Sequence, residues 1–234
     1  MFSNQQAAGA ATVAYNPYTD RGSLEFKFRS RRFVKIRQLI ETILAERGEA
    51  RILDIGGTET YWLIGKEFLR QHRNRIKITL VNTEIEHVTD TTMFDALVGD
   101  GSNPDLFGSE RFDLVHSNSV IEHVGSWERM RAFAENTKRL APRYYVQTPN
   151  YWFPLEPHFR FPGFQYLPER VRVALIMRYS LGFFRRIADL EEARDIIDHH
   201  TLISTRQIRE LFADAQVSHE KLLGFNKSII AIRS

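Results

Sequence analysis

Five short apolar runs, separated by segments with helical patterning, constrain the fold of this chain more than any other feature. The runs are RILDI, IKITLV, FDALV, FDLVHS and YYVQT, which begin at residues 51, 76, 94, 112 and 144. They are nearly continuous in apolar residues instead of alternating, as expected for strands that are covered on both faces. Helical patterns at 61–72 and 127–141 lie between them. Strands that alternate with helices predict βαβ units, and therefore an α/β fold with a parallel sheet.

The two ends of the chain add further elements. Apolar residues recur three and four positions apart over 30–48, which predicts an amphipathic helix that stops at Gly48. Near the C-terminus, the segment STRQIRELFADA predicts a helix that begins with a capping box of Ser204 and Gln207. The runs VSHEKLLG and KSIIAIR that follow predict a pair of strands joined near Gly224.

Composition narrows the class of protein. The 234 residues are 43% hydrophobic and 26% charged, as is ordinary for one globular domain. The absence of cysteine excludes disulfides, thiolate metal sites and a cysteine nucleophile, and it fits a cytoplasmic location. The basic residues over 29–37 are interpreted as a solvated helix face, so no nucleic-acid partner is expected. Since no apolar run reaches 18 residues, no transmembrane span is expected.

The sequence predicts a mobile N-terminal arm over 1–20 and a single domain over 21–234, with an insertion at 150–187. The arm has neither a basic start nor a long apolar core, so it does not resemble a signal peptide. Five of the eight prolines fall in 149–168 among aromatic residues, which disfavours regular sheet there. We expect this insertion to cover an acceptor site as a lid. Peripheral contact with a membrane surface is the alternative, because 159–186 is aromatic and then amphipathic.

The loop after the first run raises the question of its ligand. Gly56 and Gly57 begin a tight turn, but the third glycine of a dinucleotide-binding G-x-G-x-x-G is missing. The acidic residues near this loop and after the next two runs are Asp54, Glu59, Glu84 and Asp100. Carboxylates repel phosphates and suit hydroxyls, amines or a sulfonium. The predicted ligand is therefore a nucleoside that is cationic and carries no phosphate.

Five segments resemble a known family. RILDIGGTETYW, ITLVNTE, VGDGSNPD, FDLVHSNSVIEHV and YYVQTPN resemble, in order and spacing, the motifs of class I methyltransferases that use S-adenosylmethionine, over roughly 30–234. They are most similar to the bacterial small-molecule (type 11-like) group. The resemblance implies a Rossmann-like, doubly wound and mostly parallel seven-stranded sheet, with an antiparallel C-terminal strand and a lid insertion after the fifth strand. It implies methyl transfer by in-line displacement, on a scaffold that oxygen, nitrogen and carbon acceptors share. From the aromatic residues over 150–186 we expect a small-molecule, lipid-like or glycan-precursor acceptor, methylated at oxygen.

The same resemblance assigns cofactor-binding roles. The residues implied for S-adenosylmethionine are Asp54, Gly56 and Gly57 at its methionine end, Asn82 or Glu84 at the ribose, Asp100 with Gly101 at the adenine amine, and Ser117, Asn118 and Ser119 along the methionine part. The chain departs from the family at the missing third glycine. It also departs at Asn82, which stands where an acid is usual, so the ribose ligand stays open between Asn82 and Glu84.

Two motifs offer catalytic candidates. Glu156 and His158 are two positions apart, and on an extended chain they point to the same side. His158 is therefore a candidate general base that Glu156 orients. His123, in the IEHV motif, is a second candidate, with a role in shaping the acceptor pocket. In DIIDHHTL, the adjacent histidines His199 and His200 diverge on a helix, so we interpret them as a helix end and predict no metal site.

Two other classes of function stay open. One is a nucleotide-dependent oxidoreductase, against which stand the incomplete glycine fingerprint and the lack of a Tyr-x-x-x-Lys motif near the fourth strand. The other is a non-catalytic binding protein on the same Rossmann-like fold. Turnover of the cofactor separates an enzyme from the second class.

Overall fold

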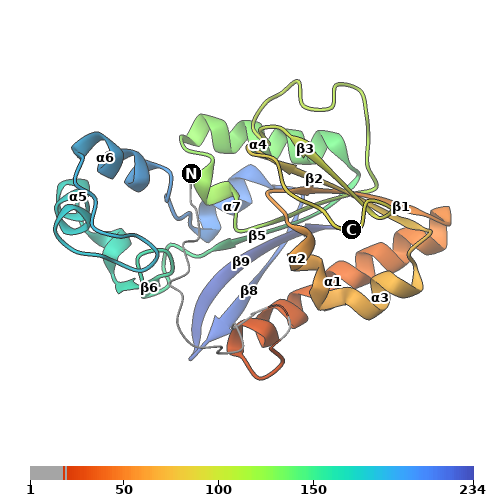
Figure 1. The fold of residues 1–234 in the computed structure, drawn as a ribbon, viewed down its shortest axis with the longest axis horizontal. Helices are drawn as coiled ribbons and strands as arrows, with labels where there is room; N and C mark the ends of the chain where they lie inside the picture. Colours follow the sequence, from red (N-terminus) through yellow and green to blue (C-terminus); the bar gives the residue numbers. More distant parts are fainter. Residues whose placement is uncertain (1–17, 19) are drawn as a thin grey trace.

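Seven strands form one sheet in the order β3-β2-β1-β4-β5-β9-β8 (Figure 1). The first five strands are parallel, and β9 pairs antiparallel with both β5 and β8. The bounds are β1 Ala50–Ile55, β2 Ile76–Asn82, β3 Phe94–Val98, β4 Leu114–Asn118, β5 Arg143–Pro149, β8 Gln216–Leu222 and β9 Phe225–Arg233. The predicted α/β fold with a mostly parallel seven-stranded sheet is confirmed.

Helices cover both faces of the sheet in this computed structural model, which describes residue 18 and residues 20–234. The predicted arm over 1–20 lies almost wholly outside the described residues. The helices α1 (Leu24–Arg47) and α3 (Lys66–Gln71) lie on one face, and α4 (Trp127–Leu140) and α7 (Thr205–Leu211) lie on the other (Figure 1). An apolar core lies on each face of the sheet, and neighbouring residues of β1 contribute to both, Ile52 to one and Leu53 to the other. The sheet is therefore doubly wound.

Local signals explain most helix boundaries. The helix α1 begins after the N-cap Ser23, earlier than the predicted residue 30, and it ends at Gly48 with φ of 84°. The capping box of Ser204 and Gln207 is confirmed at the start of α7. The helix predicted over 61–72 is instead divided into α2 (Glu59–Trp62), the 3-10 turn η1 (Leu63–Gly65) and α3.

The segment between β5 and α7 builds a small lobe beside the sheet, at the left of Figure 1. Its elements are β6 Leu155–Glu156, β7 Phe161–Pro162, the 3-10 turn η3 Phe164–Tyr166, α5 Glu169–Arg178 and α6 Leu190–Asp198. The lobe has its own apolar core, which runs from Phe159 to Ile197 and so passes beyond residue 187. Its helix α5 ends at Arg178, and α6 packs against α5. No described helix is both long and apolar enough to cross a membrane.

The strand order places a candidate site. The chain runs outward from β1 to β2 and β3, then returns to the other side of β1 with β4 and β5. The carboxyl ends of β1 and β4 therefore flank the point at which the winding reverses. Ligands of open α/β sheets bind at such a point, outside the carboxyl ends of the strands.

Candidate functional site

A cavity of about 190 Å³ opens at this reversal point. Its walls come from the ends of β1, β2 and β3, the segment after β4, and α4. The residues of the sequence prediction that line it are Gly56, Asn82, Asp100, Gly101 and His123. Others of the prediction do not line it: Asp54, Gly57, Glu84, Asn118 and Ser119. The structure thus divides the predicted set into residues at the cavity and residues around it.

The turn after β1 has room for glycine alone. Gly56 has φ of 74°, and its N–H donates to the carbonyl oxygen of Val81 at 2.7 Å. A Cβ atom at position 56 would stand 2.3 Å from a methyl of Val120, and one at position 57 would overlap the carboxylate of Asp54. Close packing on both sides of the turn therefore brings the backbone of β1 to the edge of the cavity.

Asp54 lies beneath this turn and not in the cavity. It is fully buried, and both of its oxygens have partners. Trp62 Nε1 donates to Oδ2 at 2.8 Å, and His116 Nδ1 lies 2.6 Å from Oδ1. Because Trp62 and His116 each engage one oxygen, the carboxylate connects the end of β1 to α2 and β4. Direct contact of Asp54 with a cofactor stays a prediction.

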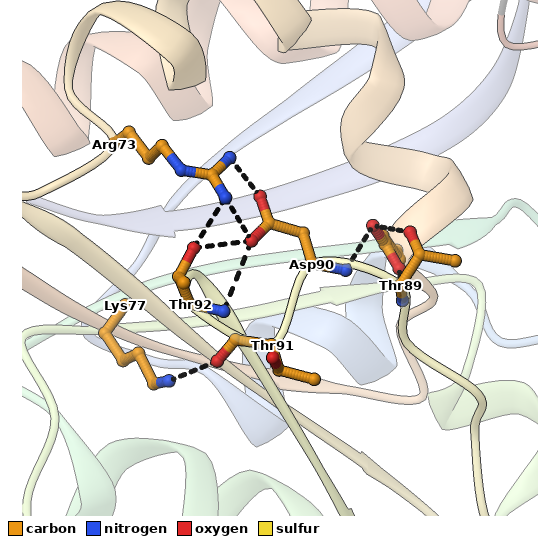
Figure 2. A network of polar contacts seen from close by, with 7 residues as sticks. Arg73, Lys77, Thr89, Asp90, Thr91 and Thr92 are labelled. Carbon is orange, nitrogen blue, oxygen red and sulfur yellow. Dashed lines mark hydrogen bonds and ion pairs between the residues drawn. The ribbon is translucent and has the colours of Figure 1, made fainter.

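Glu59 is also turned away from the cavity. Its carboxylate accepts from the hydroxyl of Thr89 at 2.6 Å and from the backbone of Thr89 and Asp90. Figure 2 shows the same loop, in which Asp90 receives the guanidinium of Arg73 and the hydroxyl of Thr92. Glu59 therefore ties the β2–β3 loop to the start of α2. Of the four acids that the sequence places near the loop, Asp100 alone lines the cavity.

Asp100 is an ionised acceptor at the cavity wall. Ser102 donates to Oδ1 through its N–H at 2.8 Å and its hydroxyl at 2.7 Å, and Arg129 of α4 donates to Oδ2 at 2.6 Å. Partial burial alone would raise the pKa of Asp100, but these hydrogen bonds outweigh it and the net shift is downward. A carboxylate of this kind accepts a hydrogen bond from an amine and donates none.

The end of β2 offers the two alternatives for a ribose ligand. Asn82 lines the cavity, and its Nδ2 donates to the carbonyl oxygen of Gly57 at 2.9 Å, which leaves Oδ1 as an acceptor. Glu84 lies two residues farther on and is exposed. Position therefore favours Asn82, and the choice between them stays a prediction.

The end of β4 is held by a buried arginine. Arg32 of α1 donates to Asn118 Oδ1 at 2.9 Å and to Gln147 Oε1 at 3.0 Å, and it forms a two-bond ion pair with Glu220. Ser119 has φ of 58° and its hydroxyl donates to Gln147 at 3.1 Å. The interpretation of 29–37 as a solvated face is wrong for Arg32, because these partners allow its charge to be buried.

The catalytic candidates meet where the lobe joins the sheet. His158 Nδ1 lies 2.7 Å from Glu156 Oε1, while Glu156 Oε2 accepts from the N–H of Phe159 at 2.6 Å. His123 packs edge to face on His158, and His200 packs on both. Burial and then the neighbouring histidines lower the pKa of His200 to about 4, so this ring is neutral near pH 7.

Sequence reasoning missed two of these residues. Arg129 lies in the helical pattern 127–141, and nothing in that pattern indicates that the first turn of the helix faces the cavity. His200 was considered only beside His199, as part of a helix end. That interpretation is confirmed for both residues, because the ring of His199 hydrogen-bonds to the carbonyl oxygen of Asp195 and the ring of His200 to that of Ile196, both in the last turn of α6. His200 itself lies outside the helix, and its ring also packs on that of His123.

Comparison with known proteins places the chain in a family. The model described as a methyltransferase domain matches residues 28–218. Among curated proteins, none matches this sequence. Solved structures that are similar include the N-terminal domain of EvdMO1 with SAH bound, at 14% identity and a TM-score of 0.48, with 90% of this chain and 80% of that chain covered.

Two further structures are similar at the same level. An O-methyltransferase family protein from Burkholderia thailandensis is 15% identical with a TM-score of 0.45, and the match covers 90% of this chain and 60% of that chain. The N-methyltransferase NodS from Bradyrhizobium japonicum WM9 is 14% identical with a TM-score of 0.45, and the match covers 90% of this chain and 96% of that chain. Likeness at these scores says nothing about the acceptor.

Proposed function

Because the chain belongs to the methyltransferase-domain family, whose cofactor is S-adenosylmethionine, we propose that it methylates an oxygen of a small-molecule, lipid-like or glycan-precursor acceptor. Family membership supports methyl transfer and the cofactor. The acceptor class and the oxygen are supported by the site alone. The observation that carries the oxygen is the His158–Glu156 pair, because an acceptor hydroxyl must lose its proton and His158 packs on His123, which lines the cavity.

The residues at the cavity fit a nucleoside cofactor without phosphates. Asp100 supplies an ionised acceptor for an exocyclic amine, and Asn82 supplies an amide oxygen for ribose hydroxyls. Gly56 and Gly101 line the cavity at positions where a Cβ atom would collide with Val120 and with Ile55, so the two turns are closely packed around it. Arg129, the cation at the cavity, is already paired with Asp100, so no free cation of the cavity lining awaits a pyrophosphate.

The chain's own residues would prepare the acceptor. Glu156 accepts the Nδ1–H of His158, so the lone pair of Nε2 is available to take a proton from an acceptor hydroxyl. His123 lines the cavity and packs on His158, which links the base to the methyl donor. The cofactor supplies an activated methyl group. Holding the acceptor oxygen in line with it lowers the barrier by roughly 7–11 kcal/mol in well-oriented systems.

The lobe supports an apolar or bulky acceptor. Trp152 is 65% exposed and Phe183 is 67% exposed, and both belong to this segment of the chain. Trp152 also packs on Tyr166, which is 44% exposed, and a contiguous exposed apolar patch is typical of a surface that binds other molecules. We include in the proposal that the lobe covers the acceptor, and that it contacts a membrane surface when the acceptor is a lipid.

Binding measurements test the cofactor site. Isothermal titration with S-adenosylmethionine, S-adenosylhomocysteine, NADH and ATP should give binding of the two adenosyl sulfur compounds alone. Asp100→Ala should weaken that binding about tenfold, the effect of one lost hydrogen bond to a charged group. Asp105→Ala, a change to an exposed aspartate of the same loop, should leave it unchanged. Binding of NADH in place of the sulfur compounds would support the oxidoreductase alternative.

Transfer of a labelled methyl group tests the chemistry. Purified protein and labelled cofactor are incubated with hydroxylated lipids, phenols and sugars, and with an amine analogue of each. We expect label in the hydroxyl compounds and a product in which the new methyl lies on oxygen. Label on the amines instead would contradict the oxygen assignment. Cofactor that binds but transfers label to none of a broad acceptor set would favour the non-catalytic alternative.

A further inference from the structure

Three histidine side chains from distant segments meet between the sheet and the lobe. His123 lies in the 3-10 turn η2 (Ile121–His123), His158 lies between β6 and β7, and His200 follows α6. The ring centroids are 4.8 Å apart for His123 and His158, 4.7 Å for His123 and His200, and 4.9 Å for His158 and His200. Each ring therefore touches both of the others.

The Nδ1 atom of each ring is already engaged by an oxygen. These oxygens are the carbonyl of His199 for His123 at 2.8 Å, Glu156 Oε1 for His158 at 2.7 Å, and the carbonyl of Ile196 for His200 at 2.6 Å. Carbonyl and carboxylate oxygens accept hydrogen bonds, so the proton lies on Nδ1 and the neutral ring keeps a lone pair on Nε2. Metal-binding histidines are oriented in this way, with the second nitrogen donating to a carbonyl or carboxylate.

A buried glutamate completes the cluster. Glu122 is fully buried, and its Oε2 accepts from the hydroxyl of Thr148 at 2.9 Å. Its Oε1 is buried and has no hydrogen-bond partner among the described residues. Ligand atoms of Glu122, His123 and His158 all lie within 4.8 Å of one another. A buried carboxylate oxygen without a donor is costly, and a cation beside it removes that cost.

We propose that Glu122, His123 and His158 bind one divalent transition-metal ion of the Zn²⁺ type, and that the ring of His200 packs beside the two histidine ligands. Two imidazoles and a carboxylate are a ligand set that Zn²⁺ and related ions favour, whereas Ca²⁺ and Mg²⁺ prefer oxygen ligands alone. Zn²⁺ holds such ligands at about 2.0–2.2 Å, so tetrahedral ligands stand roughly 3.4 Å apart. The cluster reaches this spacing by a side-chain contraction on the order of 1 Å.

The position of the ion next to the cavity suits it to a role in methyl transfer. This role rests on the proposed function, whereas metal binding itself does not. His123 also lines the cofactor cavity, so the ion adjoins the place of methyl transfer. A divalent ion lowers the pKa of a hydroxyl that coordinates it, and the hydroxyl proton is released to solvent. With the ion bound, His158 is a ligand, and the ion replaces it as the group that prepares the acceptor oxygen.

Metal binding is tested on the whole chain after treatment with a chelator. Titration of ZnCl₂ into the stripped protein should give one strong equivalent per chain by isothermal titration. His123→Ala and His158→Ala should each weaken binding by at least about 100-fold, since each removes a ligand. Titration with Co²⁺ should produce visible absorption bands in the wild type, and the same variants should lose them.

The control variants separate the site from the surface and from misfolding. His87→Ala changes an exposed histidine outside the cluster and should leave zinc binding unchanged. Glu122→Gln keeps an oxygen for Thr148 and so should preserve the circular dichroism spectrum while weakening zinc binding. The proposal is overturned if the wild type binds no stoichiometric zinc, or if binding is as tight in the His123 and His158 variants as in the wild type.

Titration of S-adenosylmethionine into stripped and zinc-loaded protein distinguishes this inference from the proposed function. Cofactor binding without zinc binding would overturn the metal site and leave the methyltransferase assignment in place. If the wild type binds zinc, the His123 and His158 variants bind it more weakly, and no form binds the cofactor, the metal site is supported and the proposed function is contradicted.

Discussion

Two buried carboxylates, Asp54 and Glu122, differ in how completely their oxygens are satisfied. Both are fully buried, and both lie near the carboxyl ends of the central strands, Asp54 inside the end of β1 and Glu122 just after β4. Asp54 receives Trp62 on one oxygen and His116 on the other. Glu122 receives Thr148 on one oxygen, and its other oxygen has no partner among the described residues.

The difference separates a structural group from a binding group. A buried carboxylate with both oxygens satisfied stabilises its surroundings, because removing it leaves buried donors unpaired. A buried carboxylate with a bare oxygen costs stability until something binds there. Asp54 therefore holds the glycine turn in place, while its direct contact with a cofactor stays a prediction, and Glu122 has a buried oxygen that the proposed metal ion would satisfy. The predictions below test this contrast, from the largest effect to the smallest.

Asp54→Ala should cause the largest loss. It leaves Trp62 Nε1 and His116 Nδ1 without their acceptor in a dry interior, and it opens a void beneath the turn. We expect the free energy of unfolding to fall by about 2–6 kcal/mol, because two buried donors are left unpaired at about 1–3 kcal/mol each. Urea denaturation measures this, and Asp54→Asn, which keeps one acceptor oxygen, should lose less. Equal stability of Asp54→Ala and wild type would end the assignment of Asp54 to the scaffold.

Gly56→Ala should be next in size. A side chain there adopts the left-handed conformation at φ of 74° and also collides with Val120. We expect the free energy of unfolding to fall by about 2–4 kcal/mol, with weaker cofactor binding, because strain and collision add. Gly224→Ala is the matched control, since Gly224 has φ of 86° but open space around it, and it should lose only about 1 kcal/mol. Equal losses in the two variants would show that Val120 yields without cost.

The sheet was predictable from sequence because its signals are local. Continuous apolar runs identify strands buried on both faces, and the capping box at Ser204 identifies the start of α7. The position of the cavity follows from strand order alone. The glycine turn and the acidic residues indicated Gly56 and Asp100, and the family resemblance implied Asn82 and Gly101; all four line the cavity.

The partners of buried polar groups were not predictable, because they come from distant segments. Nothing local to Asp54 indicates that His116 will occupy one of its oxygens. The sequence around Arg32 indicates a surface cation, because its partners Glu220 and Gln147 lie far away in the chain. In the same way, His200 joins His123 and His158 only through the packing of the lobe, whose aromatic and proline-rich sequence has no regular period.

Asp100 should give a smaller, pH-dependent effect. Its pKa is lowered from the ordinary 3.8, so ionisation stabilises the folded state above that value and the contribution disappears as pH falls through the folded pKa. Asp100→Asn should therefore be less stable than wild type at neutral pH, and the difference should disappear as the pH falls through the lowered pKa of Asp100. The side chain is 36% exposed, so we expect a difference below about 1 kcal/mol. Urea denaturation across this range measures it, with Asp105→Asn as the control that shows no such change.

Glu122→Gln should have the smallest effect on stability in protein stripped of metal. The amide oxygen still accepts from Thr148, and the amide nitrogen replaces an oxygen that has no donor facing it. The change also removes a buried charge, so we expect the free energy of unfolding to stay within about 1 kcal/mol of wild type or to rise.

Glu156→Gln is the comparison variant for Glu122→Gln, because Glu156 is also buried but both of its oxygens are engaged by donors. Glutamine there must set its NH₂ group against either the Nδ1–H of His158 or the N–H of Phe159, which should cost about 1–3 kcal/mol. The two Glu→Gln variants thus compare a glutamate whose second oxygen faces a donor, Glu156, with one whose second oxygen faces none, Glu122. Should Glu122→Gln destabilise the stripped protein as much as Glu156→Gln does, the bare oxygen of Glu122 has a partner in solution, and the contrast with Asp54 fails.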